Sequence, residues 1–173
     1  VCDTVIVGNG TRYEGQYPCG EGVLYSDSLG IFIGHFENGV PNGVCTHYKK
    51  NGHRYYGEFE DGKYSGYGKY FSGSGTVCIG DFENGLPNGI DTLFFRRQSI
   101  YIGACKNGQL HGQGVYYKNT PASRRYFYQE GQFADGKLNN GYRSHFNRTN
   151  YIVNGKSMPC SDFIYYSQKE LQS

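Results

Sequence analysis

Cysteines, histidines and closely spaced carboxylates are the residues of this sequence that could bind a metal or catalyse a reaction. The 173-residue chain has five histidines and six cysteines, the latter at positions 2, 19, 45, 78, 105 and 160. The cysteines form no C-x-x-C pair, and no cysteine–histidine spacing is typical of a metal site. We therefore predict no metal and no cofactor, and we expect reduced thiols in a cytosolic protein.

Two pairs of carboxylates could supply general acid–base catalysis: Glu58 with Glu60, and Asp81 with Glu83. The members of each pair are two residues apart in an expected strand, so both would project from its exposed face. A solvated carboxylate lacks the burial that tunes a catalytic pKa. No glycine-rich loop is followed by the Lys-Ser/Thr pattern of a phosphate site either. The sequence therefore predicts a protein that is not an enzyme.

The 27 glycines, about 16% of the chain against a usual ~7%, define an internal repeat. A glycine within an aromatic/aliphatic-x-Gly-x-aromatic pattern recurs at separations of 19, 23, 23, 23 and 28 residues. We take these glycines as the origins of six repeats: Gly15, Gly34, Gly57, Gly80, Gly103 and Gly131. Most origins are followed by glycines five and nine positions later, as expected for turns in tight hairpins. Each repeat is predicted to form two short antiparallel strands.

The aromatic residues predict which face of these strands is buried. With 18 Tyr, 11 Phe and no Trp, rings supply most of the large apolar side chains. The positions two before and two after each origin are mostly Tyr, Phe or Cys, and period two places both positions on one face. The residues in the corresponding place of the second strand are expected to share that face: Leu24, His47, Tyr70, Leu93, Tyr116 and His145. His47 and His145 are therefore interpreted as packing residues rather than catalytic ones.

The residue that follows each of these second-strand positions is aromatic in every repeat, and its ring is expected to point to the opposite face. This aromatic column consists of Tyr25, Tyr48, Phe71, Phe94, Tyr117 and Phe146. A single-layer sheet cannot bury both faces by itself, and an apolar stripe in water usually marks an interaction surface. We predict that the column binds a helix or peptide of a partner protein, or a second copy of the chain in a homodimer. Packing of the rings on one another or under the C-terminal tail is the alternative.

The repeat closely resembles the MORN (membrane occupation and recognition nexus) repeat, as in Tyr55-Tyr56-Gly57-Glu58-Phe59-Glu60-Asp61-Gly62-Lys63-Tyr64-Ser65-Gly66-Tyr67-Gly68-Lys69-Tyr70. The resemblance covers roughly residues 5 to 155 and implies an all-β fold, an elongated, twisted, single-layer antiparallel sheet of stacked β-hairpins. It also implies a scaffold that binds proteins, often as a dimer or larger oligomer, and links complexes to the cytoskeleton or membrane. The sequence departs from the pattern where a third glycine is expected, at Cys45, Asp91 and Arg143.

The predicted domain organisation is a MORN-repeat array over residues 1–158 and a capping segment or linker over residues 159–173. The segment 161–171, which follows Pro159, is compatible with a short helix that has Ser161 as its N-cap. The chain begins with Val1 rather than Met, and from this we expect a piece of a longer protein.

Charged residues are predicted to segregate along the two edges of the sheet. The net charge is only +2, so no global field favours nucleic acid or an anionic membrane. Many basic residues fall in the expected turns between repeats, and seven of them form a predicted anionic-ligand edge: Lys49, Lys50, Arg54, Arg96, Arg97, Arg124 and Arg125. This edge could make a weak contact with anionic lipid or with acidic protein segments. Solvated turns whose charges need no ligand are an equally good interpretation. Nucleic-acid binding is not predicted, because the basic residues do not lie among exposed aromatic residues.

These observations favour a non-enzymatic protein–protein interaction scaffold in the cytoplasm, associated with the cytoskeleton or a membrane. One alternative is an accessory region of a larger enzyme, because MORN arrays can precede SET-type methyltransferase or lipid-kinase domains. Another is a phosphoinositide-binding module that acts through its basic edge. A carbohydrate- or choline-binding hairpin repeat is disfavoured, because such repeats depend on Trp and this sequence has none.

Overall fold

A computed structural model describes residues 4–8, 10–96, 98–120, 125–145 and 148–159. These residues form strands and turns without a helix, which confirms the predicted all-β class. The chain divides into two compact units, an N-terminal unit of residues 1–89 and a C-terminal unit of residues 90–173. The predicted C-terminal helix and the capping segment after Pro159 lie outside the described residues.

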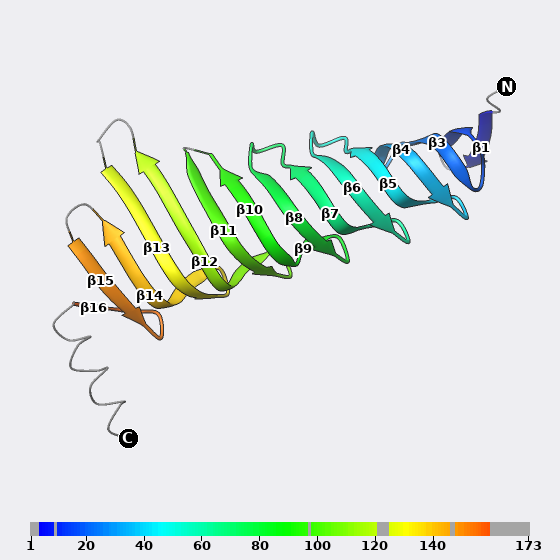
Figure 1. The fold of residues 1–173 in the computed structure, drawn as a ribbon. Helices are drawn as coiled ribbons and strands as arrows, with labels where there is room; N and C mark the ends of the chain where they lie inside the picture. The colour runs from blue at the N-terminus through cyan, green and yellow to red at the C-terminus, as the bar shows by residue number, and fades with distance from the viewer. Residues whose placement is uncertain (1–3, 9, 97, 121–124, 146–147, 160–173) are drawn as a thin grey trace, which may run out of the picture. The chain divides into compact units, whose positions relative to one another are not determined.

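The strands of the N-terminal unit are β1 (Thr4–Gly8), β2 (Thr11–Gly15), β3 (Gly20–Ser26), β4 (Gly30–Glu37), β5 (Val40–Tyr48), β6 (Arg54–Glu60), β7 (Lys63–Phe71), β8 (Val77–Glu83) and β9 (Leu86–Pro87). Those of the C-terminal unit are β10 (Gly89–Phe95), β11 (Ser99–Lys106), β12 (Gln109–Thr120), β13 (Arg125–Ala134), β14 (Lys137–His145), β15 (Arg148–Val153) and β16 (Lys156–Pro159). Within each unit the strands pair antiparallel in chain order, and β9 pairs with β8 (Figure 1). The predicted stacked hairpins are therefore present in both units.

Asn-Gly or Asp-Gly turns join the two strands of most repeats. In the turn between β6 and β7, Asp61 and Gly62 have φ angles of 48° and 76°. A two-residue hairpin turn of this kind needs positive φ at both positions, which Asn or Asp followed by Gly adopts with little strain. The same pair of positive φ angles recurs at Asn38-Gly39, Asn84-Gly85, Asn107-Gly108, Asp135-Gly136 and Asn154-Gly155. The glycines five positions after the origins are thus turn residues, as predicted.

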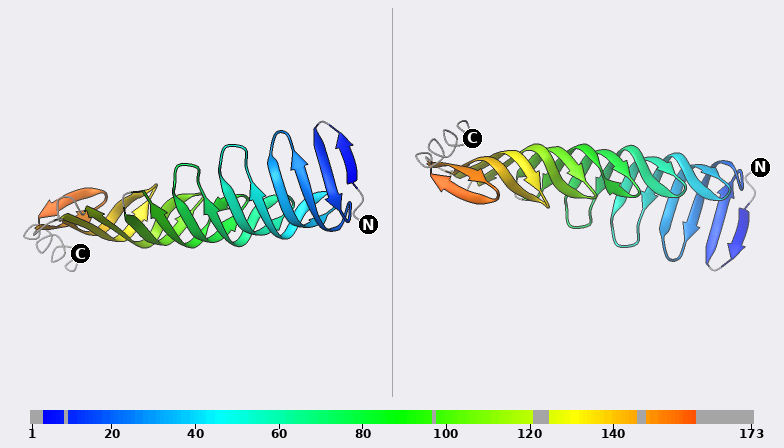
Figure 2. Two further views of the ribbon diagram at one scale, coloured as in Figure 1. Left: turned by 90° about the horizontal axis from the view of Figure 1, so that it is seen from above. Right: turned by 90° about the horizontal axis from the view of Figure 1, so that it is seen from below.

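A β-bulge interrupts the register of the long hairpins close to the origin glycine. The register shifts between Gly57 and Phe59 in β6, and equivalent shifts occur in β4, β11 and β13. A bulge bends its strand and increases the local twist. The hairpins accordingly bend along their length within each unit (Figure 2). Neighbouring hairpin ends are linked, because the Gly62 amide donates a hydrogen bond to the Pro41 carbonyl at 2.9 Å.

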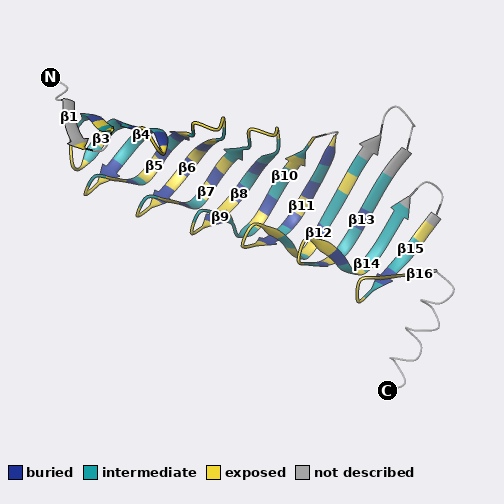
Figure 3. Ribbon diagram, turned by 180° about the vertical axis from the view of Figure 1, so that it is seen from behind, coloured by how far each residue is buried: buried dark blue, intermediate teal, exposed yellow. Residues whose placement is uncertain are grey.

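One face of the sheet is buried and the other is open to solvent. Along β6, Tyr55, Gly57 and Phe59 are buried and alternate with exposed residues (Figure 3). The positions two before the origins are buried in the first five repeats, and so are those two after the origins from the Gly34 repeat onward. Leu24 and His47 are buried as predicted, and the corresponding Tyr70, Leu93 and Tyr116 are half-buried. Figure 3 shows this alternation along most strands.

Tyr17, which stands two positions after Gly15, lies on the predicted face but is not buried. Its ring packs edge-on against the buried Tyr13, with ring centres 5.2 Å apart, yet it is 40% exposed. The first repeat has a shorter hairpin loop, and residues 16–19 form a bend instead of a strand.

The third glycine is present in the repeats that have Tyr two positions before the origin, and also in the sixth repeat, where Gly141, and not Arg143 as predicted, pairs with Gly131. Tyr13, Tyr55 and Tyr101 are matched by Gly22, Gly68 and Gly114. In the Gly57 repeat the Tyr55 hydroxyl lies so close to Gly68 that a Cβ atom there would be 2.3 Å from the hydroxyl oxygen. The pairing of Tyr with Gly is therefore steric.

The Gly34 repeat has Phe32 in place of the tyrosine and Cys45 in place of the third glycine. Cys45 keeps the strand register, because it pairs with Gly34 on one side and with Gly57 on the other. The replacement of the third glycine by Cys45 therefore leaves the pairing with both neighbouring strands in place.

Candidate functional site

Three members of the aromatic column lie in one row across the open face of the N-terminal unit. The register pairs Tyr25 with Ile31, Ile31 with Tyr48 and, one strand on, Arg54 with Phe71. Tyr48 is 43% exposed, whereas Tyr25 and Phe71 are half-buried. The structure thus brings these predicted partner-binding residues together on one surface.

A second row runs beside the first and was not recognised in the sequence. Thr46 pairs with Ile33 on one side and with Tyr56 on the other, and Tyr56 is 55% exposed. Ile33 and the nearby Val44 are also exposed. Both rows belong to the same face, because residues two apart in a strand point the same way. Strict alternation along β6 would have found Tyr56, because it is the neighbour of the buried Tyr55.

Arginine side chains cover two rings of the column. The Arg12 guanidinium lies 4.3 Å from the centre of the Tyr25 ring, and the Arg54 guanidinium lies 5.5 Å from that of Phe71. Arg12 also pairs with Glu14 at 3.3 Å. Cation–π contacts of this kind hold the arginine side chain flat over the ring. The open face therefore presents rings, aliphatic side chains and charges of both signs.

The C-terminal unit carries two described members of the column on its own open face. Phe94 and Tyr117 are both exposed, as is Ile102. Tyr117 pairs with Ile100 in β11 and with Tyr128 in β13. The open face of this unit therefore resembles that of the N-terminal unit in composition.

Tyr128, Glu130 and Tyr142 form a hydrogen-bonded cluster on the same unit. Both tyrosine hydroxyls donate to the Glu130 carboxylate. These two hydrogen bonds lower the pKa of Glu130, and the bond to the carboxylate raises the pKa of Tyr128. Glu130 therefore stays ionised at neutral pH as a fixed negative charge among rings. The sequence did not reveal this pair, because the spacing of the other repeats would place Glu130 opposite Arg143, whereas the register pairs it with Tyr142.

The described basic residues of the predicted anionic-ligand edge differ in their contacts. Lys50 lies 3.8 Å from Asp27, and Arg54 begins β6 and covers Phe71. The Lys49 ammonium lies 5.5 Å from the centre of the Tyr64 ring, and Arg96 is exposed. Four predicted site residues lie outside the described residues or have side chains that do: Arg97, Arg124, Arg125 and Phe146.

The side chains considered for catalysis lie in solvent. Glu58, Glu60, Asp81 and Glu83 are exposed, as predicted, and Glu58 accepts a hydrogen bond from the backbone amide of Tyr67 at 3.2 Å. Among the described residues, no group of three or more His, Cys, Asp or Glu side chains could hold a metal ion. No helix in this part of the chain is long and apolar enough to cross a membrane.

Hairpins of similar length, stacked in chain order and closed by Asn/Asp-Gly turns, define a β-hairpin repeat protein. The family model of the MORN repeat matches residues 32–54, 55–77, 78–90 and 101–120. The chain is therefore a MORN-repeat protein, and MORN repeats are commonly interaction modules for proteins or membranes. No curated protein matches the chain in sequence.

Proposed function

We propose that this chain is a non-enzymatic scaffold whose open face binds a helix or peptide segment of a partner protein. The observation that carries this proposal is the contrast between the two faces of one strand: Tyr55 is fully buried, whereas its neighbour Tyr56 is 55% exposed. Exposed rings and aliphatic side chains that adjoin one another usually mark an interaction site. Removing apolar surface from water stabilises a complex by roughly 25 cal/mol per Å².

The charges of the open face favour a protein over an anionic membrane. Arg12 and Arg54 lie over rings, and Arg12 is paired with Glu14. Glu58 adds an exposed carboxylate beside Val44. An anionic lipid surface would be repelled by these carboxylates, whereas a protein segment can carry charges complementary to both the arginines and the carboxylates.

Site-specific photo-crosslinking tests the proposal. A photoreactive phenylalanine analogue is placed at position 48 or 56 of the chain, and, as a control of similar exposure away from the open face, at position 17, where Tyr17 is 40% exposed and packs against the buried Tyr13. We expect one protein to crosslink at positions 48 and 56 but not at 17. Crosslinking without preference for the open face would contradict the proposal.

Light scattering on the same chain separates a second copy from another partner. A dimer that becomes a folded monomer on Tyr48→Ser/Tyr56→Ser would identify the partner as a second copy. A monomer in both cases leaves the open face for a different protein, which the crosslink then identifies. Far-ultraviolet circular dichroism checks that the variant keeps its strands.

The scaffold could equally be an accessory region of a larger enzyme, since the docking chemistry would be the same. We also propose a cytoplasmic location. It is supported by the thiols of Cys45, Cys78 and Cys105, which are buried in the core like small apolar side chains.

A further inference from the structure

The Tyr128–Glu130–Tyr142 cluster holds a carboxylate between two tyrosine side chains on the open face of the C-terminal unit. Glu130 follows Tyr128 by two residues on β13, and Tyr142 lies opposite Glu130 on the neighbouring β14 (Figure 1). The two tyrosine rings have their centres 5.6 Å apart and are inclined by 35° to one another. All three side chains are half-buried, so a partner can reach them from solvent.

Only one oxygen of the Glu130 carboxylate is used within the cluster. The hydroxyls of Tyr128 and Tyr142 both donate to the same oxygen, Oε2. Among the residues that the structure describes, no hydrogen bond or ion pair reaches the other oxygen, Oε1. Because the two hydrogen bonds lower the pKa of Glu130, the carboxylate is ionised at neutral pH. The cluster therefore presents a negative charge with an oxygen that can accept from an incoming donor.

The open-face residues beside the cluster bring no positive charge to it. The register surrounds Glu130 with uncharged side chains: Gln113, Val115, Tyr117, Gln132, Asn140 and Ser144. Arg143 is next to Tyr142 in sequence but points to the core side, where it contacts the buried Gln129 and lies 5.7 Å from the centre of the Phe127 ring. Within the described part of this face, the charge of Glu130 is thus not neutralised by an adjacent cation.

The first repeat shows what such a carboxylate binds when a cation is at hand. Glu14 precedes Gly15 as Glu130 precedes Gly131. The Tyr25 hydroxyl donates to Oε2 of Glu14 at 3.5 Å, and Nε of Arg12 lies 3.3 Å from Oε1. The Arg12 guanidinium also lies 4.3 Å from the centre of the Tyr25 ring. The chain itself therefore contains an arginine held by one carboxylate oxygen and one tyrosine ring.

The sixth repeat has the carboxylate without an arginine of its own. Tyr128 takes the place that Arg12 has in the first repeat, two residues before the glutamate. The other four repeats have no carboxylate before the origin glycine, where they carry Ile33, Tyr56, Ile79 and Ile102. A glutamate that is flanked by tyrosines and lacks an arginine on its own strand is thus particular to the sixth repeat.

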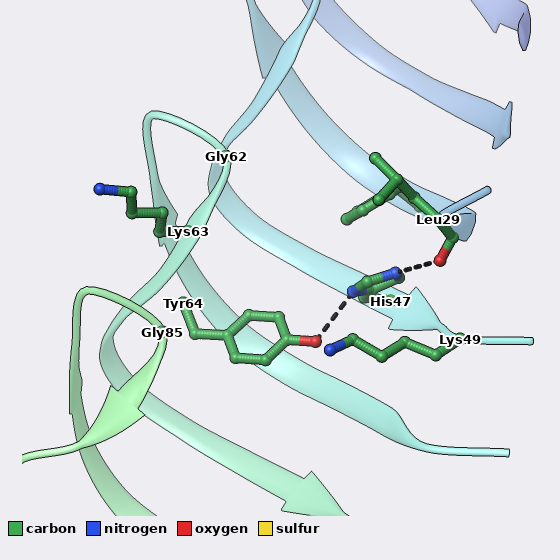
Figure 4. A pocket seen from close by; sticks show the side chains of 8 residues that line it. Leu29, His47, Lys49, Gly62, Lys63, Tyr64 and Gly85 are labelled. Atoms are coloured by element: carbon green, nitrogen blue, oxygen red, sulfur yellow. Dashed lines mark hydrogen bonds between the residues drawn. The ribbon is translucent and has the colours of Figure 1, made fainter. Parts of the chain in front are cut away.

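The pocket on the core side of the N-terminal unit differs from this cluster, because its polar side chains satisfy one another. Its wall includes Leu29, His47 and Tyr64. Nε2 of His47 donates to the Leu29 carbonyl at 2.9 Å, which leaves Nδ1 of the neutral ring to accept from the Tyr64 hydroxyl at 2.9 Å (Figure 4). Both ring nitrogens of His47 are occupied, whereas Glu130 keeps an oxygen for a ligand.

We propose that the Tyr128–Glu130–Tyr142 cluster binds an arginine side chain of a partner protein, with the guanidinium on Oε1 of Glu130 and against a tyrosine ring. This inference rests on the proposed function, since it names one residue of a segment that docks on the open face. A planar guanidinium can pair with a carboxylate and stack on a ring at once, whereas a lysine ammonium is a more strongly hydrated point charge. A metal ion fits less well, because the described residues contain no group of three or more His, Cys, Asp or Glu that could hold one.

Two parallel selections from one peptide library test the proposal. Random 12-residue peptides are selected on the whole wild-type chain, in one case after removal of peptides that bind the Glu130→Gln chain. In the other case, peptides that bind the Tyr48→Ser/Tyr56→Ser chain are removed first. We expect the first selection to yield peptides that share an arginine.

Fluorescence anisotropy titrations then measure how these peptides bind the variants. Glu130→Gln should weaken binding about tenfold, since it removes a charged hydrogen-bond acceptor, and Tyr142→Ser should weaken it severalfold. Asp135→Asn removes an exposed carboxylate from the same unit, so it is the matched control and should leave affinity unchanged. Far-ultraviolet circular dichroism checks that each variant keeps its strands.

Substitutions in the peptide give a second readout that does not depend on how a variant folds. Citrulline, a neutral analogue of arginine, should weaken binding about tenfold when it replaces the shared arginine, and lysine should weaken it severalfold. Equal affinities of the arginine and lysine peptides would show that the cluster recognises charge alone, which would overturn the assignment to arginine.

The pair of selections separates this proposal from the proposed function. If the first selection enriches nothing, or enriches peptides without arginine, the arginine site is refuted. Peptides from the second selection would in that case still support docking on the open face of the N-terminal unit. If neither selection enriches peptides, both proposals fail.

Discussion

The Gly57 and Gly34 repeats differ in the side chain that donates a hydrogen bond to the backbone carbonyl of the residue after the origin glycine. In the Gly57 repeat, the Tyr55 hydroxyl donates to the Glu58 carbonyl at 3.0 Å, across the small Gly68. In the Gly34 repeat, the Cys45 thiol donates to the equivalent His35 carbonyl at 3.0 Å. Burial raises the pKa of Cys45 to about 11, so the thiol keeps the proton that it donates. Both carbonyls lie at a β-bulge, where the ladder hydrogen bonds are interrupted.

The two arrangements have different consequences for the rings. Tyr55 is held by its hydroxyl and stacks on Tyr64, with ring centres 3.8 Å apart. Phe32 has no hydroxyl to anchor it at the bulge, and it stacks on His47, which bonds to Tyr64 of the next hairpin. The stack of Phe32 on His47 and the hydrogen bond from Tyr64 therefore arise where the phenylalanine–cysteine arrangement adjoins the tyrosine–glycine one. Substitutions that convert one arrangement into the other test this comparison.

The largest loss of folding stability is expected from Gly68→Ala. The new Cβ would lie 2.3 Å from the Tyr55 hydroxyl and 2.5 Å from the adjoining ring carbon, and the ring cannot retreat because it is packed on Tyr64. Overpacking of this kind typically costs about 1–3 kcal/mol, and we expect the upper end of that range. Urea denaturation followed by circular dichroism measures the loss. Lys69→Ala, at the exposed neighbour, should change the free energy of unfolding by less than about 0.5 kcal/mol.

Tyr55→Phe should have the next largest effect. The Tyr55 hydroxyl donates to the Glu58 carbonyl and lies 3.2 Å from the Ser65 carbonyl, so its removal leaves these acceptors without their partner. An unsatisfied buried group costs about 1–3 kcal/mol. Tyr56→Phe, at an exposed position of the same strand, serves as the control in urea denaturation. Equal unfolding midpoints for the two variants would show that the hydroxyl is not needed at the bulge.

Transplanting the phenylalanine–cysteine pair should partly rescue these losses. In Tyr55→Phe/Gly68→Cys, the thiol can donate to the Glu58 carbonyl as Cys45 does to that of His35. Since the two positions touch, we expect their effects to be non-additive, with a coupling of about 1 kcal/mol in favour of the pair. A double-mutant cycle from four urea titrations measures it. Additive losses would mean that the two arrangements are not interchangeable.

The repeat itself was predictable because it depends on local chemistry. Hairpin turns follow from Asn/Asp-Gly pairs, and the buried and open faces follow from period two, as at Tyr55 and Tyr56. The His47–Tyr64 hydrogen bond was not predictable, because it joins two repeats and depends on how their rings stack. The sequence did contain one signal, since Tyr64 takes the place of Pro41 and Pro87 in the adjacent repeats.

The smallest change in stability is expected from the pH dependence of His47, which stacks on Phe32 in the phenylalanine–cysteine arrangement. Burial lowers the pKa of His47, and the nearby charge of Lys49 acts in the same direction, against the hydrogen bond to the Leu29 carbonyl. In the unfolded chain this histidine takes up a proton near pH 6.5. Below that pH the unfolded state binds a proton that the folded state does not, so the His47 contribution to stability is complete above about pH 6.5 and is lost as the pH falls.

His47→Leu isolates this contribution, because Leu24 and Leu93 occupy the corresponding positions of two other repeats. We expect the free energy of unfolding of the wild type to fall more steeply from pH 7.5 to 5.5 than that of the variant. The other histidines are common to both proteins and cancel in the difference. Parallel curves in urea titrations at several pH values would show that His47 titrates alike in the folded and unfolded chains. The stack on Phe32 and the hydrogen bonds of His47 would then not keep the ring neutral, and the contrast with the tyrosine–glycine repeat would be one of packing alone.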